Sequence, residues 1–566
     1  MESETGGHKV DEVELSEELK ESYLYNKDLA PTKIKDRTWG TYNYAALWIG
    51  MSHCIPTYML ASGLIEGGMS WKQAVFTIML GNLIVLLPML LNSYAGAKYG
   101  IPFPVLCRSS FGVLGANIPA VMRAIVACGW FGIQTWIGGE ALFTLILSFL
   151  EPFSSGGTAE FFIWLKLYGP WLCFFVFWFL NMIIIWRGME SVRHFENWAA
   201  PVVLVIALGL LWWAVKAAKG FGPILNVPSK FDNLATFFPF FIINLTGMVG
   251  YWATLSLNMP DFTRFSKSQT QQMLGQTLGL PTTMTFFAAL GVLITSATVV
   301  IYGKPIWDPI QLLANFKQPI VVIISLFTIA VATLSVNVAA NIVSPSFDFS
   351  NLWPKRISFK IGGTITGIIG ILMMPWKLLK DYGTYIFGWL VGYSAFLGPI
   401  AGILICDFWL IRRRRLALKD LYDPEGAYGF RGKAEVIPFI LLGALIAIDS
   451  GLLLDQVLCR IVTKYPSICS SSLQYLSCIT IPAVIIGFIL ARLLLRFGIN
   501  WKAVFSLFLG ITAALVGLVI PGLKALYSYA WFVGFAVSFV SYLVLMSFSV
   551  RKIEAEETAD VGLSSQ

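Results

Sequence analysis

Long apolar runs recur along nearly the whole chain of 566 residues, and they constrain its fold more than any other feature. A helix needs about 20 mainly apolar residues to cross the hydrocarbon core of a bilayer. In lipid, only helices and closed barrels satisfy every backbone polar group. The sequence therefore predicts an all-α polytopic membrane protein with about 14 transmembrane helices of this length, at 41–66, 71–96, 117–149, 168–187, 198–217, 236–259, 278–302, 319–343, 359–375, 381–411, 437–458, 473–497, 502–523 and 526–548.

Charge supports the same interpretation and adds an orientation. Charged residues make up only 13% of the chain, against roughly 25% in a soluble protein. The net charge of +8 comes from basic residues that follow the even-numbered spans, among them Lys98, Arg264, Arg412 and Arg551. By the positive-inside rule we expect both termini in the cytoplasm, in a plasma or inner membrane. This topology explains the basic excess, so we expect no nucleic-acid partner. The first 38 residues are polar and contain no apolar run, so we expect no cleaved signal peptide.

The familiar enzyme motifs are missing from the sequence. It contains no P-loop, no H-E-x-x-H and no G-x-S-x-G, and its eight cysteines form no C-x-x-C pair. We therefore expect no enzyme activity, no ATP-driven transport and no cofactor or metal centre beyond a coupling ion.

Two spans carry helix-breaking residues near their centres. Pro56 lies inside the first span, where a helix should unwind near 53–56, and Gly247 with Gly250 weakens the sixth. Paired interrupted helices indicate the central site of a transporter built from two repeats. Ordinary proline and glycine usage in membrane helices is the alternative. The spacing predicts a five-plus-five repeat with these segments: a tail 1–38, repeats 39–217 and 236–411, further helices up to 548 and a tail 549–566.

A few polar and aromatic side chains lie inside the apolar spans. Trp130 and Gln134 are one helical turn apart on one face of the third span. Ser335, Asn337 and Asn341 lie in the eighth span. An indole beside an amide suits a planar, uncharged ligand rich in amide groups. Hydrogen bonds between neighbouring helices are the alternative role for these amides.

Several ordered motifs resemble the nucleobase:cation symporter-1 family, with bacterial allantoin permeases as the most similar branch. The motifs are Asn26-Lys-Asp-Leu-Ala-Pro31, Gly100-Ile-Pro-Phe-Pro104, Gly129-Trp-Phe-Gly-Ile-Gln134, Pro260-Asp-Phe-Thr-Arg264, Asn337-Val-Ala-Ala-Asn341 and Gly398-Pro-Ile-Ala-Gly402. They cover about 26–432 and 500–548, whereas 433–499 has no counterpart. The resemblance therefore implies an inserted helix pair at 433–499, followed by two last helices at 500–548. The resemblance implies an inverted-repeat fold with alternating access that imports allantoin, hydantoin, uracil, cytosine or a purine.

The resemblance also implies the residues of the site. Trp130 and Trp252 would stack on either side of the ring, and Gln134 and Asn341 would pair with its amide and carbonyl edges. Cys54 stands where relatives have an amide side chain that can touch the substrate. Cysteine is a weak hydrogen-bonding group, so the ligand is expected to differ on that side.

A cation site is implied between the first and eighth spans. Its ligands would be carbonyls of Gly50, His53 and Ala332 and the hydroxyl of Ser335. Val336 stands where the sodium-dependent pattern has a second hydroxyl. A hard cation that loses one oxygen ligand is bound more weakly. Sodium and proton coupling therefore both stay open.

Two titratable groups inside the spans are candidates for proton coupling. Glu140 lies beyond Trp130 and Gln134 in the third span, and His53 lies at the interruption of the first. A water-exposed Glu140 at the outer mouth, and a His53 that contributes only its carbonyl, are the alternatives.

The residues together favour a secondary-active, cation-coupled importer of a neutral heterocycle, embedded in membrane lipid. A substrate sensor on a transporter scaffold is the rival hypothesis. The sequence indicates neither the heterocycle nor the oligomeric state.

Overall fold

The computed structural model describes residues 15–150, 159–187, 205, 208–306, 308–314, 319–379, 388–430 and 498–563. Within these ranges the chain is helical, and the only β-pairing is an isolated bridge between Trp39 and Ser266. The described residues contain nine helices that are long and apolar enough to cross a membrane: Trp71–Tyr99, Asn117–Leu150, Glu160–Arg187, Leu234–Tyr251, Gln269–Tyr302, Val322–Leu352, Gly388–Ile411, Trp501–Val519 and Ala530–Ser547. The predicted all-α polytopic fold is confirmed.

The remaining predicted spans take other forms. The first is divided into α2 (Thr41–Ser52) and α3 (Ile55–Glu66). The fifth and ninth correspond to the shorter apolar helices Leu208–Ala217 and α17 (Phe359–Leu372). α17 ends before the predicted 375 because Met374 has a positive φ of 51° and Pro375 starts a new turn, α18 (Pro375–Leu378). The inserted pair at 433–499 lies almost wholly outside the described residues, so the total of 14 helices stays a prediction.

The chain forms two compact units, and each is described by itself. One unit comprises Asn26–Pro102 and Ala120–Tyr393, and the other comprises Met1–Tyr25, Phe103–Pro119 and Ser394–Gln566. These units do not follow the predicted repeat boundaries, so the five-plus-five repeat and the segment limits stay predictions.

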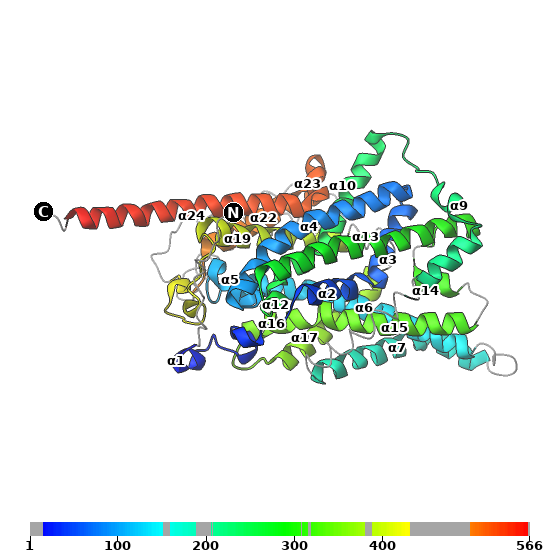
Figure 1. The fold of residues 1–566 in the computed structure, drawn as a ribbon, viewed down its shortest axis with the longest axis horizontal. Coiled ribbons are helices and arrows are strands. Elements are labelled where there is room, and N and C mark those ends of the chain that lie inside the picture. The colour runs from blue at the N-terminus through cyan, green and yellow to red at the C-terminus, as the bar shows by residue number, and fades with distance from the viewer. Residues whose placement is uncertain are drawn as a thin grey trace, which may run out of the picture. The chain divides into compact units, whose positions relative to one another are not determined.

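In the unit Asn26–Pro102 and Ala120–Tyr393, the helix α13 (Gln269–Tyr302) packs against α2, α3 and α4 (Trp71–Tyr99), as Figure 1 shows. Its glycines permit this closeness. A Cβ on Gly279 would come within 2.7 Å of the Trp48 ring, and one on Gly275 within 2.5 Å of Tyr44. Small residues at helix contacts are typical of membrane proteins, in which backbones approach closely to gain packing energy.

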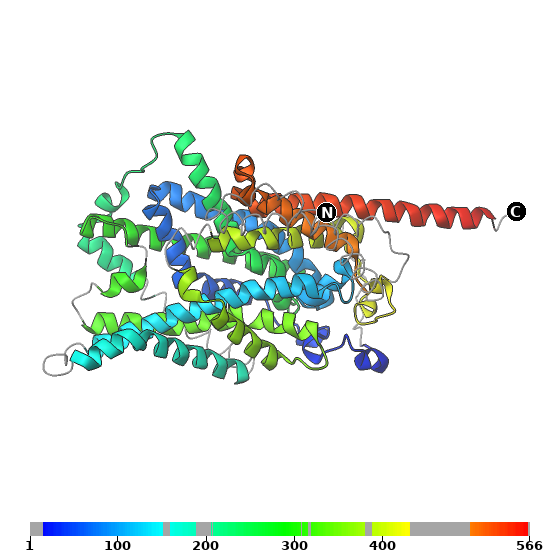
Figure 2. The same cartoon turned by 180° about the vertical axis from the view of Figure 1, so that it is seen from behind.

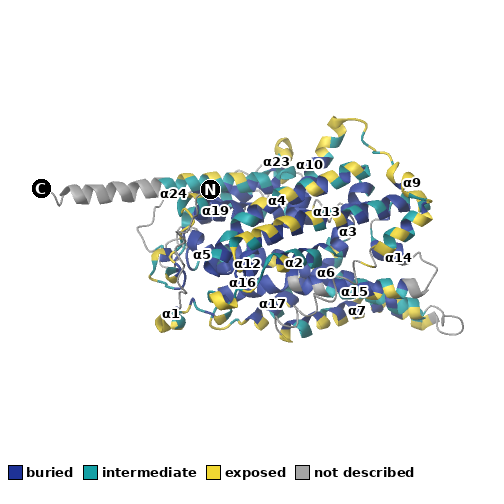
Figure 3. Ribbon diagram, in the orientation of Figure 1, coloured by how far each residue is buried: buried dark blue, intermediate teal, exposed yellow. Residues whose placement is uncertain are grey.

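On another side of this unit, α6 (Asn117–Leu150) meets α7 (Ala159–Arg187), and both are seen in Figure 2. A Cβ on Gly139 would lie 2.7 Å from the backbone of Phe174. The exposed surface of α7, seen as yellow stretches of its ribbon in Figure 3, is apolar. Its exposed large apolar residues include Ile163, Leu167, Leu172, Phe175 and Phe179. In a membrane protein such a face is suited to lipid contact.

Three helices of this unit are interrupted. Between α2 and α3, Cys54 is extended (φ −143°, ψ 161°), and Pro56 lies in the first turn of α3. Trp252 (φ −102°, ψ 8°) separates α10 (Leu234–Tyr251) from α11 (Ala253–Asn258). α15 (Pro319–Asn341) is followed by α16 (Val343–Leu352) after an interruption at Ile342. The first two interruptions lie within a few residues of the predicted positions, and the third was not predicted.

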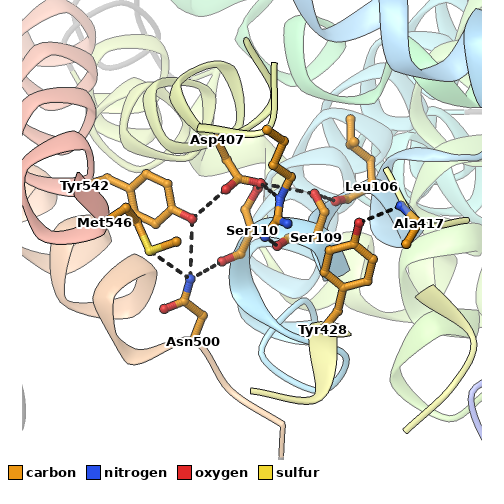
Figure 4. Close-up of polar contacts among 10 residues, drawn as sticks. Leu106, Ser109, Ser110, Asp407, Ala417, Tyr428, Asn500, Tyr542 and Met546 are labelled. Carbon is orange, nitrogen blue, oxygen red and sulfur yellow. Dashed lines mark hydrogen bonds and ion pairs between the residues drawn. The ribbon is translucent and has the colours of Figure 1, made fainter. Parts of the chain in front are cut away.

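The other unit is centred on α5 (Phe103–Phe111), α22 (Trp501–Val519), α24 (Ala530–Leu563) and the end of α19 (Val391–Ile405). A π-helical turn, Cys406–Ile411, continues α19 and places Asp407 in a buried polar cluster, drawn in Figure 4. Glycines again permit close packing, since a Cβ on Gly398 would lie 2.4 Å from the Trp531 carbonyl oxygen.

Candidate substrate-binding site

A cavity of about 320 Å³ lies where the interruptions of the first and sixth predicted spans meet α6 and α15. It is lined by all the residues that the sequence assigned to the substrate: Cys54, Trp130, Gln134, Trp252 and Asn341. The unwound backbone at Cys54 and at Trp252 brings each of these side chains to the cavity wall. Residues separated by up to 287 positions therefore converge on one small space.

Trp130 is held in place by a chain of hydrogen bonds. Its indole Nε1 donates to the Tyr393 hydroxyl at 3.2 Å, and that hydroxyl donates to the Gly250 carbonyl at 2.7 Å. Gly250 lies just before the interruption at Trp252, so this chain ties α6 to the end of α10. A fixed indole at the cavity wall offers a flat surface for stacking.

Tyr251 links the two candidate stacking residues. Its ring lies edge-on to Trp130, with centroids 5.2 Å apart, and edge-on to Trp252 at 4.9 Å. Trp48 also packs edge-on against Trp252, at 5.1 Å. The indoles are thus fixed by neighbouring rings.

Two polar atoms at the cavity lack partners among the described residues. The Gln134 Oε1 and the Trp252 Nε1 are buried, and neither has a hydrogen bond there. A buried polar group without a partner is costly and calls for an explanation. One acceptor and one donor beside a stacking surface match the mixed acceptor and donor edge of an amide-containing ring.

Asn341 and Asn337 have different surroundings, although both were candidates from the sequence. Asn337 Nδ2 donates to Asn181 Oδ1, Thr135 Oγ1 and the Phe131 carbonyl at 3.1–3.3 Å, so it joins neighbouring helices. Asn341 is the last residue of α15 and lines the cavity, and its Nδ2 donates to Asn337 Oδ1 at 3.0 Å. That bond orients the Asn341 amide and leaves its oxygen as an acceptor.

Cys54, Thr57 and Tyr251 form a cluster of mutual polar contacts. The Cys54 Sγ lies 3.3 Å from the Thr57 Oγ1 and 3.2 Å from the Tyr251 Oη, and the two hydroxyl oxygens are 3.0 Å apart. The cluster connects the two interrupted helices. Sequence reasoning missed Tyr251 and Tyr393, although the position of Tyr251 directly before Trp252 in a glycine-containing segment could have suggested it.

A second cavity, of about 750 Å³, also reaches Cys54 and is lined by His53 and Ala332. These are two of the predicted cation-site residues. Gly50 lies in the last turn of α2, and Ser335 lies in α15, but its hydroxyl is outside the described side chains. Val336 lines the smaller cavity. The cation site itself therefore stays a prediction.

The two candidates for proton coupling lie apart from the smaller cavity. The His53 ring contacts Phe287 edge-on at 4.3 Å, and its Nδ1 is buried without a partner among the described residues. Glu140 is half-buried on α6, accepts a hydrogen bond from Trp136 and interacts electrostatically with Asp308. The described part of the chain contains no group of three or more His, Cys, Asp or Glu that could hold a metal ion.

Comparison with known proteins gives the family. Residues 31–463 match the family of permeases for cytosine/purines, uracil, thiamine and allantoin. The chain belongs to this permease family. The matched segment includes every residue named in the two cavities. Since the family consists of membrane permeases, the chain is a transporter and not an enzyme.

Individual members of this permease family are similar over most of the chain. An allantoin permease of Bacillus subtilis is 38% identical over 524 residues, covering 92% of this chain and 93% of its own. A purine-uracil permease of Arabidopsis thaliana is 41% identical over 462 residues, covering 80% and 74%. The structure also resembles Mhp1, a nucleobase-cation-symport-1 family transporter solved with bromovinylhydantoin bound, with a TM-score of 0.67, 21% identity and coverage of 94% and 96%. This likeness shows a shared fold.

Proposed function

We propose that this permease imports an uncharged, nucleobase-like heterocycle by cation-coupled alternating access, with allantoin as the first candidate and uracil, hydantoin, cytosine or a purine next. One observation carries the proposal. Trp130, Gln134, Trp252 and Asn341 converge on one cavity, where an acceptor and a donor are buried without partners among the described residues. The names of the relatives, which concern allantoin, purines, uracil and a hydantoin, support the same class of ligand.

In this proposal the ring of the substrate stacks against Trp130 and Trp252. The Gln134 Oε1 accepts a hydrogen bond from a ring N–H, and Asn341 supplies a further acceptor. Cys54 contacts the remaining edge.

The proposal is tested by expressing the protein in cells that do not themselves take up allantoin and measuring their uptake of labelled allantoin. We expect saturable accumulation, with competition by the heterocycles that bind best among hydantoin, uracil, cytosine, adenine, guanine and urate. Binding to purified protein without accumulation in cells would favour the sensor hypothesis. If the protein neither binds nor takes up any member of the panel, the proposed substrate class is wrong.

Coupling requires its own experiment. We propose that the cation is held by Gly50, His53, Ala332 and Ser335, and that its binding is weakened because Val336 offers no hydroxyl. If the coupling ion is a proton, Glu140 and His53 are the alternative proton carriers. Uptake is measured with sodium replaced by choline and, separately, with a protonophore. Loss only in choline would indicate sodium coupling in spite of Val336, and loss only with the protonophore would indicate proton coupling.

We also propose that the permease resides in the plasma or inner membrane with both termini in the cytoplasm. The basic residues after the even-numbered spans support this orientation. Labelling of single cysteines placed in tails and loops by a membrane-impermeant reagent tests it. Labelling of either tail in intact cells would contradict the orientation.

A further inference from the structure

The two cavities are neighbours, and Cys54 lines both of them. The smaller one is the candidate substrate site. The larger one extends between α3, α13, α14 (Pro309–Ala314) and α15, and much of its wall is apolar, with Phe287, Leu290, Ile294, Leu313 and Ile329. The function proposed above assigns no role to this apolar wall.

The polar cluster of Cys54, Thr57 and Tyr251 separates the two spaces. Tyr251 lines the smaller cavity, Thr57 lines the larger, and the two hydroxyl oxygens are 3.0 Å apart. The Cys54 Sγ contacts both hydroxyls, 3.2 Å from the Tyr251 Oη and 3.3 Å from the Thr57 Oγ1. We call these three residues the partition.

The partition is rigid on the substrate side. The Tyr251 ring is held edge-on between Trp130 and Trp252, at 5.2 and 4.9 Å, while its hydroxyl contacts the partition. Rotation of the ring would break contacts at both ends. A substituent on a bound heterocycle that points toward Tyr251 therefore meets a fixed wall.

We propose that Tyr251 sets the upper limit on substrate size, because it closes the substrate cavity against the larger cavity. The larger cavity is then an apolar subsite, which accepts an alkyl substituent of the heterocycle once the Tyr251 ring is removed. The inference rests on the proposed function and deepens it. The wild-type protein selects compact heterocycles because the partition keeps larger substituents out of the neighbouring cavity. An alkyl chain that enters this space leaves water for an apolar wall and gains affinity.

The experiment compares uracil with 5-butyluracil as ligands of the purified protein, with binding measured by the change in tryptophan fluorescence. We expect wild-type protein to bind uracil at least about tenfold more tightly than 5-butyluracil. Tyr251→Ala should reduce this preference at least about tenfold, chiefly by tighter binding of 5-butyluracil.

Three further variants identify the cause. Tyr251→Phe keeps the ring and should keep the preference of the wild type. Tyr58→Ala is the matched control, because Tyr58 lines the larger cavity but is not part of the partition, and it should not admit 5-butyluracil. Leu290→Trp added to Tyr251→Ala fills the larger cavity and should restore the preference. Tyr251→Leu, which shortens the wall with less loss of packing, replaces Tyr251→Ala if that variant does not fold.

The outcomes separate the inference from the proposed function. If wild-type protein binds uracil but Tyr251→Ala and Tyr251→Leu keep the full preference, the inference is wrong while the function stands. If the double variant with Leu290→Trp still binds 5-butyluracil, the alkyl chain does not enter the larger cavity, and the subsite is wrong. If wild-type protein binds neither uracil nor any other heterocycle of the panel, the proposed function fails, and the inference fails with it.

Discussion

The candidate substrate cavity and the Asp407 cluster both bury polar groups, yet they satisfy them differently. In the cluster the Asp407 carboxylate accepts hydrogen bonds from the Arg412 Nε at 2.7 Å, the Tyr542 Oη at 2.8 Å and the Ser110 Oγ at 3.0 Å, as drawn in Figure 4. In the cavity the Gln134 Oε1 and the Trp252 Nε1 have no such partners among the described residues. The two places therefore differ in how far their buried polar groups are paired, and not in burial.

This difference has a physical basis. A fully paired polar network stabilises one arrangement of the helices, because removal of one member leaves its partners buried and unsatisfied. An unpaired group lowers stability in the free protein and recovers that free energy only when a ligand arrives. The cluster is therefore expected to govern stability, and the cavity is expected to govern affinity.

The largest expected effect is on stability at the cluster. Asp407→Ala removes the acceptor of at least three donors and leaves Arg412 without its carboxylate. We expect the free energy of unfolding to fall by about 3 kcal/mol, measured by thermal unfolding in detergent. The affinity of the folded fraction for the heterocycle should stay within about twofold of the wild type.

Phe408→Leu is a control for this substitution, because it changes the neighbouring buried side chain and leaves the carboxylate in place. Its loss of stability should be smaller. An Asp407→Ala protein that unfolds like the wild type but binds its ligand poorly would break the comparison, since the paired cluster would then behave like a site.

The next effect is on affinity at the cavity. Trp130→Ala removes the stacking surface, and base–aromatic stacking contributes about 1–3 kcal/mol per base. We expect binding to weaken by about 30-fold, measured by uptake and by ligand titration of purified protein. Asn341→Ala should also weaken binding, through loss of a polar contact. Unchanged affinity in both variants would contradict the proposed stacking site.

A smaller effect, but one that separates affinity from stability, is expected at the two amide side chains of Gln134 and Asn337. Gln134→Leu removes an unpaired acceptor, so the unfolding free energy should stay equal or rise by about 1 kcal/mol while affinity falls by about tenfold. Asn337→Leu is the matched variant, because the Asn337 amide nitrogen donates to three neighbouring groups and its oxygen accepts from Asn341. It should lower the unfolding free energy by about 1–3 kcal/mol. Thermal unfolding with and without ligand distinguishes the two.

Equal losses of stability in both variants would mean that Gln134 is a structural amide like Asn337. The hydrogen-bonding alternative raised for these residues from the sequence would then hold for the whole set, and the cavity would lose its principal polar contact.

The sequence predicted much of the fold because the bilayer imposes a simple length rule, and it placed two interruptions because proline and glycine weaken helices. The interruption at Ile342 was missed, although Pro345 lacks an N–H and crowds the carbonyl of Asn341 four residues earlier. Tyr393 could not be chosen from the sequence, because tyrosine is common in apolar spans and only tertiary contacts show that its hydroxyl holds the Trp130 indole. Tyr251 could have been suggested only by its position directly before Trp252. The difference between Asn337 and Asn341 likewise depends on Asn181 and Thr135, which lie on other helices.

The smallest effect concerns Asp308, a carboxyl group whose cost of burial is only partly offset by hydrogen bonds. It lies in the loop between α13 and α14, where burial raises its pKa from 3.8 although the Ile310 N–H donates to it. The folded state therefore binds more protons than the unfolded state above pH 3.8, and stability falls as pH rises through the raised pKa. Asp308→Asn should remove this decrease, measured as the difference in unfolding temperature between variant and wild type across a pH series. A difference that does not vary with pH would mean that the N–H bond already compensates the burial, which would place Asp308 with the paired groups of the Asp407 cluster.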